Sequence, residues 1–125
     1  MALIHEELTR EIIGAAIEVH KELGPGLLES AYHSCLCFEF ELRKISFQSK
    51  VKLPLNYKGY VLESGYEMDI FVDSKVVVEL KATTESHPVY EAQLLTYMKL
   101  TKSAVGLLIN FHVPVLKDGI TRRVL

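Results

Sequence analysis

Apolar side chains in the first third of the chain recur at three- and four-residue spacing, which predicts helices. The first helix ends at a strong stop signal, Gly24-Pro25-Gly26, and its apolar positions are Leu8, Ile12, Ala15, Ala16, Val19 and Leu23. A second helix is predicted from about Leu27 to Arg43, with an inner side formed by Leu28, Tyr32, Cys35, Leu36 and Phe40. Two helices are therefore expected to open the chain.

From Phe47 onward the period changes to the two-residue alternation of strands. Val51, Leu53 and Leu55 alternate with Lys50, Lys52 and Asn56, and Tyr57-Lys58-Gly59-Tyr60 turns the chain into another run. Two further strands, Tyr66 to Val72 and Lys75 to Leu80, are separated by the polar pair Asp73-Ser74. These runs predict a hairpin or meander of three or four antiparallel strands.

The last third predicts one helix and two strands. Pro88 suits a first helical turn and opens a helix that extends to Lys99 or Leu100. Ala104 to Phe111 is a continuous apolar run, as expected for a strand covered on both faces, and Ile120 to Leu125 can form an edge strand. This order predicts an α/β fold in which helices flank a mixed sheet.

Length and composition fit a single domain spanning residues 1–125. The chain has 125 residues, of which 49% are hydrophobic and 24% are charged, and no repeat or linker divides it. No apolar run is long enough to span a membrane and the N-terminal residues do not resemble a signal peptide, so we expect a cytoplasmic protein. The net charge of −2 supplies no general attraction to nucleic acid.

The two cysteines offer little chemistry. Cys35 and Cys37 are two residues apart in the second predicted helix, so they point in different directions and are expected to be buried thiols. His33 and Cys37 have the spacing of a zinc ligand pair, but the sequence offers no second pair.

Charges interrupt the two predicted strands between Tyr66 and Lys81. Asp69 lies within one apolar run, while Glu79 and Lys81 close the next. Burying such charges without partners costs several kcal/mol, so a metal ion, a phosphate or a tight ion-pair network is expected beside them. We interpret the stretch as a hydrolytic metal site.

Strand geometry adds a condition on the connection between these runs. Directly opposed residues of an antiparallel pair point to the same face. A three-residue turn at Asp73-Ser74-Lys75 would therefore place Asp69 opposite Glu79, whereas a two-residue turn would require a bulge.

Three short motifs resemble known signatures. Asp69 followed by Glu79-Leu80-Lys81 is similar to the motif of the PD-(D/E)XK nuclease superfamily, although Met68 stands where that motif has proline. The segment Gly26 to Tyr32 resembles the GxxExxY motif of one branch, and Gln93 to Tyr97 resembles the QxxxY motif of RecB-type exonucleases. The resemblance covers nearly the whole chain. It implies a restriction-endonuclease-like core: a helix, a three-stranded antiparallel meander, a helix and a further strand.

The resemblance also implies a function and a set of site residues. The expected activity is metal-dependent hydrolysis of phosphodiester bonds in DNA, or else RNA, by a metal-activated water. Mg²⁺ or Mn²⁺ would be held by Asp69, Glu79, the carbonyl of Leu80 and, directly or through water, Glu29. Lys81 would stand beside the attacking water, and Gln93 and Tyr97 would orient the metal-bound water or contact a phosphate.

Each assignment has a structural alternative. Glu29 lies in a first helical turn, where the helix dipole favours a carboxylate, and Gln93 with Tyr97 can form a half-buried polar pair. Tyr32 fits a core residue with a bonded hydroxyl better than a catalytic one. Glu79 with Lys81 can be a surface ion pair, but the neighbouring Val76-Val77-Val78 favours a central strand.

Two other functions remain open alongside the nuclease. One is a nucleic-acid-binding or protein-assembly module with weak or no catalysis. The other is a protein-interaction domain that dimerises through the small residues Gly14-Ala15-Ala16. Because a single small module typically buries only about 600–1,000 Å² against a duplex, a homodimer or larger complex is expected to supply further contacts.

Overall fold

The computed structural model describes residues 3–125, apart from the side chain of Ser64. Its elements along the chain are α1 (Glu6–Leu23), α2 (Glu29–Leu42), β1 (Phe47–Tyr57), β2 (Tyr60–Val72), β3 (Val76–Lys81), α3 (Pro88–Thr101), β4 (Val105–Asn110), the short 3₁₀ helix η1 (Leu116–Gly119) and β5 (Ile120–Val124). No helix in this described range is long and apolar enough to cross a membrane.

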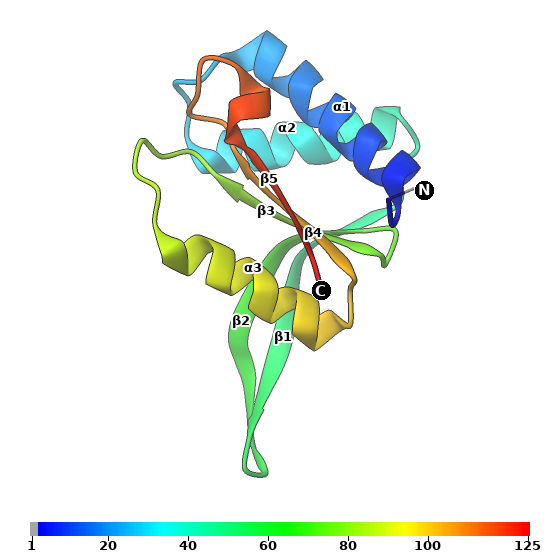
Figure 1. The fold of residues 1–125 in the computed structure, drawn as a ribbon, viewed down its shortest axis with the longest axis vertical. Coiled ribbons are helices and arrows are strands. Elements are labelled where there is room, and N and C mark those ends of the chain that lie inside the picture. Colours follow the sequence, from blue (N-terminus) through cyan, green and yellow to red (C-terminus); the bar gives the residue numbers. More distant parts are fainter. Residues whose placement is uncertain (1–2) are drawn as a thin grey trace.

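The strands form one five-stranded sheet in the order β1-β2-β3-β4-β5. Strands β1, β2 and β3 make an antiparallel meander, β4 is parallel to β3, and β5 returns antiparallel at the edge. The parallel step requires a crossover, and α3 supplies it. Figure 1 shows α1 and α2 on one side of the sheet and α3 on the other. The predicted mixed sheet flanked by helices is confirmed.

Most element boundaries agree with the pattern of the sequence, and three details differ. The chain from Tyr60 to Val72 is one continuous strand, not two runs. Leu28 lies before α2 and Cys35 lies on its outward side, and both are exposed, whereas the i, i+4 series Tyr32, Leu36, Phe40 is fully buried. The expectation that both cysteines are buried is therefore wrong for Cys35.

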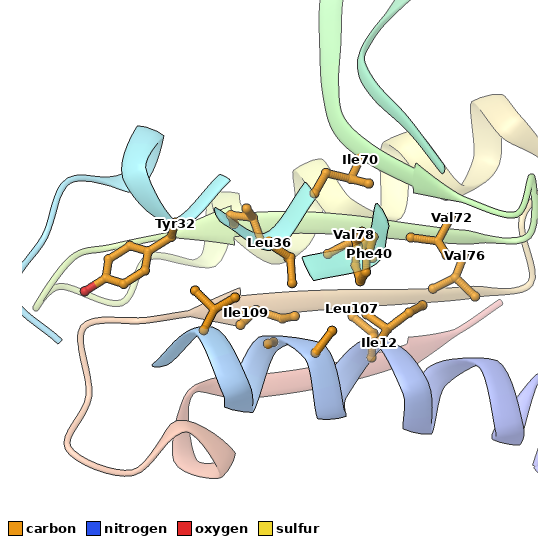
Figure 2. Packing of buried hydrophobic residues seen from close by; sticks show 14 of the residues in the cluster. Ile12, Tyr32, Leu36, Phe40, Ile70, Val72, Val76, Val78, Leu107 and Ile109 are labelled. Carbon is orange, nitrogen blue, oxygen red and sulfur yellow. The ribbon is translucent and has the colours of Figure 1, made fainter. Parts of the chain in front are cut away.

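The larger core lies between the sheet and the helix pair α1–α2. Even-numbered side chains of β3 and odd-numbered ones of β4 fill it, together with Ile70 and Val72 of β2 (Figure 2). Ala15 and Ala16 are fully buried in this cluster. The predicted dimer contact through Gly14-Ala15-Ala16 is therefore wrong, because Ala15 and Ala16 are already covered inside the domain, where α1 packs beside α2 over the larger core.

A smaller core lies beneath α3 on the opposite face. Its fully or nearly buried members are Met68, Val77, Leu94, Tyr97 and Met98. The helix approaches β4 closely at Gly106, where an added Cβ atom would lie 2.6 Å from the sulfur of Met98. Gly106 thus allows α3 to rest directly on the sheet, which fixes the height of Gln93 and Tyr97 above β3.

The far end of the β1–β2 pair is a hairpin that extends away from the rest of the molecule (Figure 1). Its turn residues Lys58 and Gly59 both have positive φ, 50° and 88°, as a tight two-residue hairpin turn requires. The Asn56 side chain accepts a hydrogen bond of 3.0 Å from the Gly59 N–H. The predicted turn from Tyr57 to Tyr60 is confirmed.

Candidate functional site

The connection between β2 and β3 has the predicted odd length. Val72 pairs with Val76 and Ile70 with Val78, so three residues, 73–75, make the turn. Asp73 and Ser74 both adopt the left-handed conformation, with φ of 52° and 51°. This register brings Asp69 and Glu79 to corresponding positions on the two strands, as the three-residue turn predicted.

The regular β2–β3 ladder ends at Ile70 and Val78. Beyond this point two backbone N–H groups donate to side-chain carboxylates, not to carbonyls of the neighbouring strand. The Leu80 N–H donates to Asp69 Oδ2 at 2.8 Å, and the Asp69 N–H donates to Glu79 Oε2 at 2.7 Å. Within residues 3–125, Asp69 Oδ1 and Glu79 Oε1 accept no hydrogen bond. Each carboxylate is therefore held by one oxygen and keeps the other for a ligand.

An irregularity on the other side of β2 coincides with this position. Lys50 and Asp69 fall between the pairs Ser49–Ile70 and Val51–Met68, and Lys50 has a φ of 53°. Met68 packs beneath α3, whereas Ile70 packs beneath α1 and α2, although residues two apart in a regular strand share a face. The strand thus rotates at Asp69, where it leaves β3.

The two carboxylates are costly to ionise in this position. Glu79 is only 3% exposed, and burial, reinforced by the nearby Asp69, raises its pKa to about 8. Burial also raises the pKa of Asp69, against the lowering effect of the Leu80 N–H. Two neighbouring carboxylates with raised pKa values are the usual result of desolvation and like charge, and a bound cation would reverse both effects.

Lys81 follows on the same face of β3 as Glu79. Its Nζ lies 4.6 Å from the centroid of the Tyr90 ring on α3, a cation–π distance. None of the ion pairs formed within residues 3–125 involves Lys81. Its charge nevertheless lowers the pKa of Glu79 and of Glu29, although in both carboxyls burial outweighs this effect. The lysine is therefore held by an aromatic ring while its charge remains available to the site.

Glu29 approaches from the first turn of α2. Its side chain forms no hydrogen bond with another described residue, and burial raises its pKa, with Lys81 and Asp69 as the next influences. Glu29 and Asp69 line the same cavity, so the carboxyl of Glu29 lies near the predicted metal ligands. Stabilisation of the α2 dipole, the structural alternative, is equally consistent with its position.

Gln93 and Tyr97 form a bonded pair on α3. The Gln93 Nε2 donates to the Tyr97 hydroxyl oxygen at 3.1 Å. Tyr97 is 2% exposed, belongs to the core beneath α3, and has its pKa raised by burial and next by Glu79. Its hydroxyl thus lies within electrostatic reach of the carboxylates, while its ring serves the core.

Sequence reasoning gave no site role to several residues around these groups. A cavity of about 250 Å³ beside Asp69 is lined by Glu29, Ser30, His33, Ser34, Lys50 and Glu67. His33 Nε2 lies 2.7 Å from the Ser49 hydroxyl, and burial lowers the pKa of the imidazole. The i, i+4 spacing of Glu29 and His33 is the signal that could have identified this histidine.

The structure also shows the surroundings of Cys37 and Tyr32. Cys37 is half-buried, and burial raises the pKa of its thiol against the effect of a hydrogen bond with Ser49, so it is poorly suited to ligate zinc as a thiolate. Tyr32 is fully buried, donates its hydroxyl to Gly24 O and accepts from the Leu27 N–H at 3.1 Å. Its ring stacks on Phe111 at 4.4 Å. The core interpretation of Tyr32 is confirmed.

The residues present fit a hard divalent cation. The free carboxylate oxygens of Asp69 and Glu79 are of the type that Mg²⁺ and Mn²⁺ prefer. The Leu80 carbonyl faces the same gap as the Leu80 N–H, because both groups of a strand residue point to one side, and the Lys81 carbonyl points instead to β4, where it accepts from Phe111. Within residues 3–125 no three His, Cys, Asp or Glu side chains form a group that could hold a metal.

Comparison with protein families gives one match. The model described as the PD-(D/E)XK nuclease superfamily matches residues 6–123, which include every site residue discussed above. This chain belongs to the PD-(D/E)XK nuclease superfamily. Its mixed sheet with flanking helices is the restriction-endonuclease-like fold expected for that superfamily, whose nucleases generally use divalent metals. Comparisons with curated proteins and with solved structures gave no match.

Proposed function

We propose that residues 1–125 form one nuclease domain of the GxxExxY branch, which hydrolyses phosphodiester bonds in a metal-dependent reaction. The observation that carries this proposal is the exchange of hydrogen bonds between Asp69, Glu79 and Leu80 at the point where β2 leaves β3. It gathers two carboxylates and a carbonyl at one gap in the sheet and leaves one oxygen of each carboxylate unbonded.

The residues that would hold Mg²⁺ or Mn²⁺ are Asp69, Glu79 and the Leu80 carbonyl, with Glu29 acting through a water. The bound cation would supply Lewis acidity and would lower the pKa of a ligated water. The chain's own residues hold the site open for it: the backbone bonds fix Asp69 and Glu79 before the ion arrives. Such preorganisation reduces the reorganisation needed during the reaction.

Lys81 is the cationic group of the site. Its position above Tyr90 keeps the ammonium from closing an ion pair with Glu79, so its charge can stabilise the negative charge that develops on the reacting phosphate. Gln93 and Tyr97 present an amide and a hydroxyl from α3, which can orient water or contact a phosphate oxygen. These groups complete a site that is acidic at its centre and cationic at one side.

The proposed substrate is DNA, with RNA as the alternative, and the proposed place of action is the cytoplasm. A homodimer or larger complex would extend the contact area beyond what one small domain offers. The contact cannot use Gly14-Ala15-Ala16, because Ala15 and Ala16 are buried.

A binding or assembly module without efficient catalysis is the second candidate. It is favoured by the fact that both carboxylates already serve as acceptors for backbone N–H groups where the strands part. In that case Asp69 and Glu79 would be retained to finish the sheet, and Lys81 to pack on Tyr90.

A cleavage assay separates the two candidates. Single- and double-stranded DNA and RNA are offered with Mg²⁺, Mn²⁺ or EDTA to the wild type, Asp69→Asn and Lys81→Met. The nuclease proposal expects metal-dependent cleavage that falls at least about a hundredfold in each variant. A matched control is Asp73→Asn, which changes an exposed carboxylate in the turn after β2. Cleavage that persists unchanged in Asp69→Asn and Lys81→Met assigns the activity elsewhere, and binding without any cleavage favours the second candidate.

A further inference from the structure

The outer end of the β1–β2 hairpin is the most exposed regular structure of the molecule. The pairing of β1 with β2 shifts register between Leu53 and Leu55, and beyond this shift Leu55 pairs with Leu62 and Tyr57 with Tyr60. We call residues 55–62 the hairpin tip. None of its residues is buried, and Figure 1 shows it reaching beyond the helices.

The tip carries aromatic and apolar side chains where a solvent-exposed turn would ordinarily be polar. Tyr57 and Tyr60 are 63% and 68% exposed, and Val61 and Leu62 are also exposed. Because Tyr57 and Tyr60 are direct partners at the end of the ladder, both rings lie on one face. Isolated exposed apolar residues need no explanation, whereas a contiguous group indicates an interaction surface.

The charge of the tip narrows the choice of partner. Residues 55–62 contain Lys58 and no Asp or Glu, in a chain whose net charge is −2. The Lys58 Nζ lies over the Tyr57 ring, 5.3 Å from its centroid, so a cation and an exposed aromatic ring are neighbours at the tip. An aromatic face beside a lysine matches a nucleobase and its phosphate, because bases stack on aromatic rings while the ammonium attracts the backbone.

The tip is also placed to serve the proposed active site. Strand β2 carries both Asp69 and Tyr60, and at about 3.3 Å per residue the tip lies roughly 30 Å from Asp69 along the strand. A polynucleotide held at Asp69 and Lys81 can therefore reach the tip several nucleotides away. This would supply a grip that the acidic centre of the site lacks.

We propose that the hairpin tip binds unpaired bases of the nucleic-acid substrate by stacking on Tyr57 and Tyr60, with Lys58 on the neighbouring phosphate. The proposal rests on the nuclease function for its ligand class and adds to it a preference for single-stranded or locally unpaired substrate. A duplex offers stacked faces only at its ends, so it would engage the tip less well.

The test is binding measured by fluorescence anisotropy in EDTA, where cleavage cannot interfere. The probes are labelled single-stranded DNA and RNA of about 25 nucleotides, longer than the ~16 that one stacking module covers, and the corresponding duplexes. The variants are Tyr57→Ser/Tyr60→Ser and Lys58→Ala. The matched control is Phe38→Ser, since Phe38 is an aromatic residue of α2 that is 60% exposed and lies outside the tip.

The double tyrosine variant is expected to weaken single-strand binding about thirtyfold or more, because it removes both rings on which bases would stack. Lys58→Ala is expected to weaken it about threefold and to reduce its salt dependence, while Phe38→Ser binds like the wild type. The circular dichroism spectra of all variants should match, since none of the substituted residues is buried.

Several results would overturn the proposal. The first two are unchanged binding of single strands by the tyrosine variant and an equal loss of binding in Phe38→Ser. The third is that the wild type binds none of the probes. The fourth is a tip variant that changes only the oligomeric state in analytical ultracentrifugation. The last result would assign the tip to a second copy of the chain. Failure of the nuclease function is separate: it would appear as absent metal-dependent cleavage with tip-dependent binding intact.

Discussion

The two ends of the β2–β3 strand pair show how one short segment serves both core and site. At the turn, Ile70 and Val72 face Val78 and Val76 in a regular ladder, and these side chains are fully buried beneath α1 and α2. Four residues from the turn the strands part, and the donors of Asp69 and Leu80 pass to carboxylates. The end at the turn, which we call the closed end, stabilises the fold by burying apolar side chains. The end where the strands part, which we call the open end, lacks this stabilisation and instead places two carboxyl groups there, each with one oxygen free of hydrogen bonds within the described residues.

At the open end, Glu79→Gln should have the largest effect on stability. It should stabilise the protein, whereas substitutions in the core usually destabilise it. The pKa of Glu79 is raised from 4.5 to about 8. The contribution of its neutral carboxyl to the free energy of unfolding is therefore fully present below pH 4.5 and is lost as the pH rises to about 8. Glu79→Gln keeps a neutral acceptor for the Asp69 N–H. In EDTA at pH 9 it should be more stable than the wild type by roughly 3–5 kcal/mol, since each pKa unit corresponds to ~1.4 kcal/mol.

Urea unfolding of both proteins at pH 4.5 and pH 9 measures this difference. The advantage of Glu79→Gln should nearly vanish at pH 4.5, where the wild-type carboxyl is already neutral. An advantage that is the same at both pH values would contradict the burial of an ionisable pair at this position.

At the closed end, Ile70→Ala should lower the free energy of unfolding by about 3 kcal/mol, because it leaves a cavity in the larger core. Val61→Ala, on the exposed hairpin tip, is the control and should change stability by less than about 0.5 kcal/mol. Equal effects at the two positions would mean that Ile70 is not held in a packed interior.

Metal addition should reduce the contrast between the two ends. At pH 8, Mg²⁺ at a hundredfold excess over its Kd should stabilise the wild type by about 2.7 kcal/mol, as expected for a ligand that binds only the folded state. The stabilisation should be smaller at pH 5, because protons compete for Glu79. Thermal unfolding with and without EDTA measures it, and an equal gain in Asp69→Asn would show that the ion binds elsewhere.

The smallest effect should come from the ring beneath Lys81. Tyr90→Leu removes the cation–π contact and should lower stability by about 0.5–1 kcal/mol. Tyr57→Leu is the matched control, because it removes the longer and more exposed contact with Lys58. Chemical denaturation of both variants compares them, and a larger loss in Tyr57→Leu would mean that Tyr90 does not hold Lys81.

The sequence was sufficient for the elements because these depend on local rules: the periods of the apolar residues predicted α1, α2 and β1. The register of the site followed from the sequence only as a condition. If Asp69 and Glu79 share a face, the turn has three residues or a bulge restores the face, and the structure has the three-residue turn. The superfamily followed from three motifs in one order, which the family model confirms.

Other features depend on contacts between distant segments and could not be predicted. The rotation of β2 at Asp69 accompanies the left-handed Lys50 on the neighbouring strand. The approach of His33 to the site requires α2 to be packed on the sheet. Small residues such as Ala15 fit a dimer contact and an internal contact equally well, so the sequence left the dimer hypothesis open, and the burial of Ala15 decides for the internal contact.

The proposed function depends on a divalent cation held by Asp69, Glu79 and the Leu80 carbonyl where β2 and β3 part. The most direct test is an anomalous difference map from crystals of the protein grown with Mn²⁺ at pH 8. We expect a peak coordinated by Asp69, Glu79 and the carbonyl of Leu80, and no peak there in crystals of Asp69→Asn. A peak at another position, or none at a Mn²⁺ concentration that supports cleavage, would show that these residues do not hold the cation.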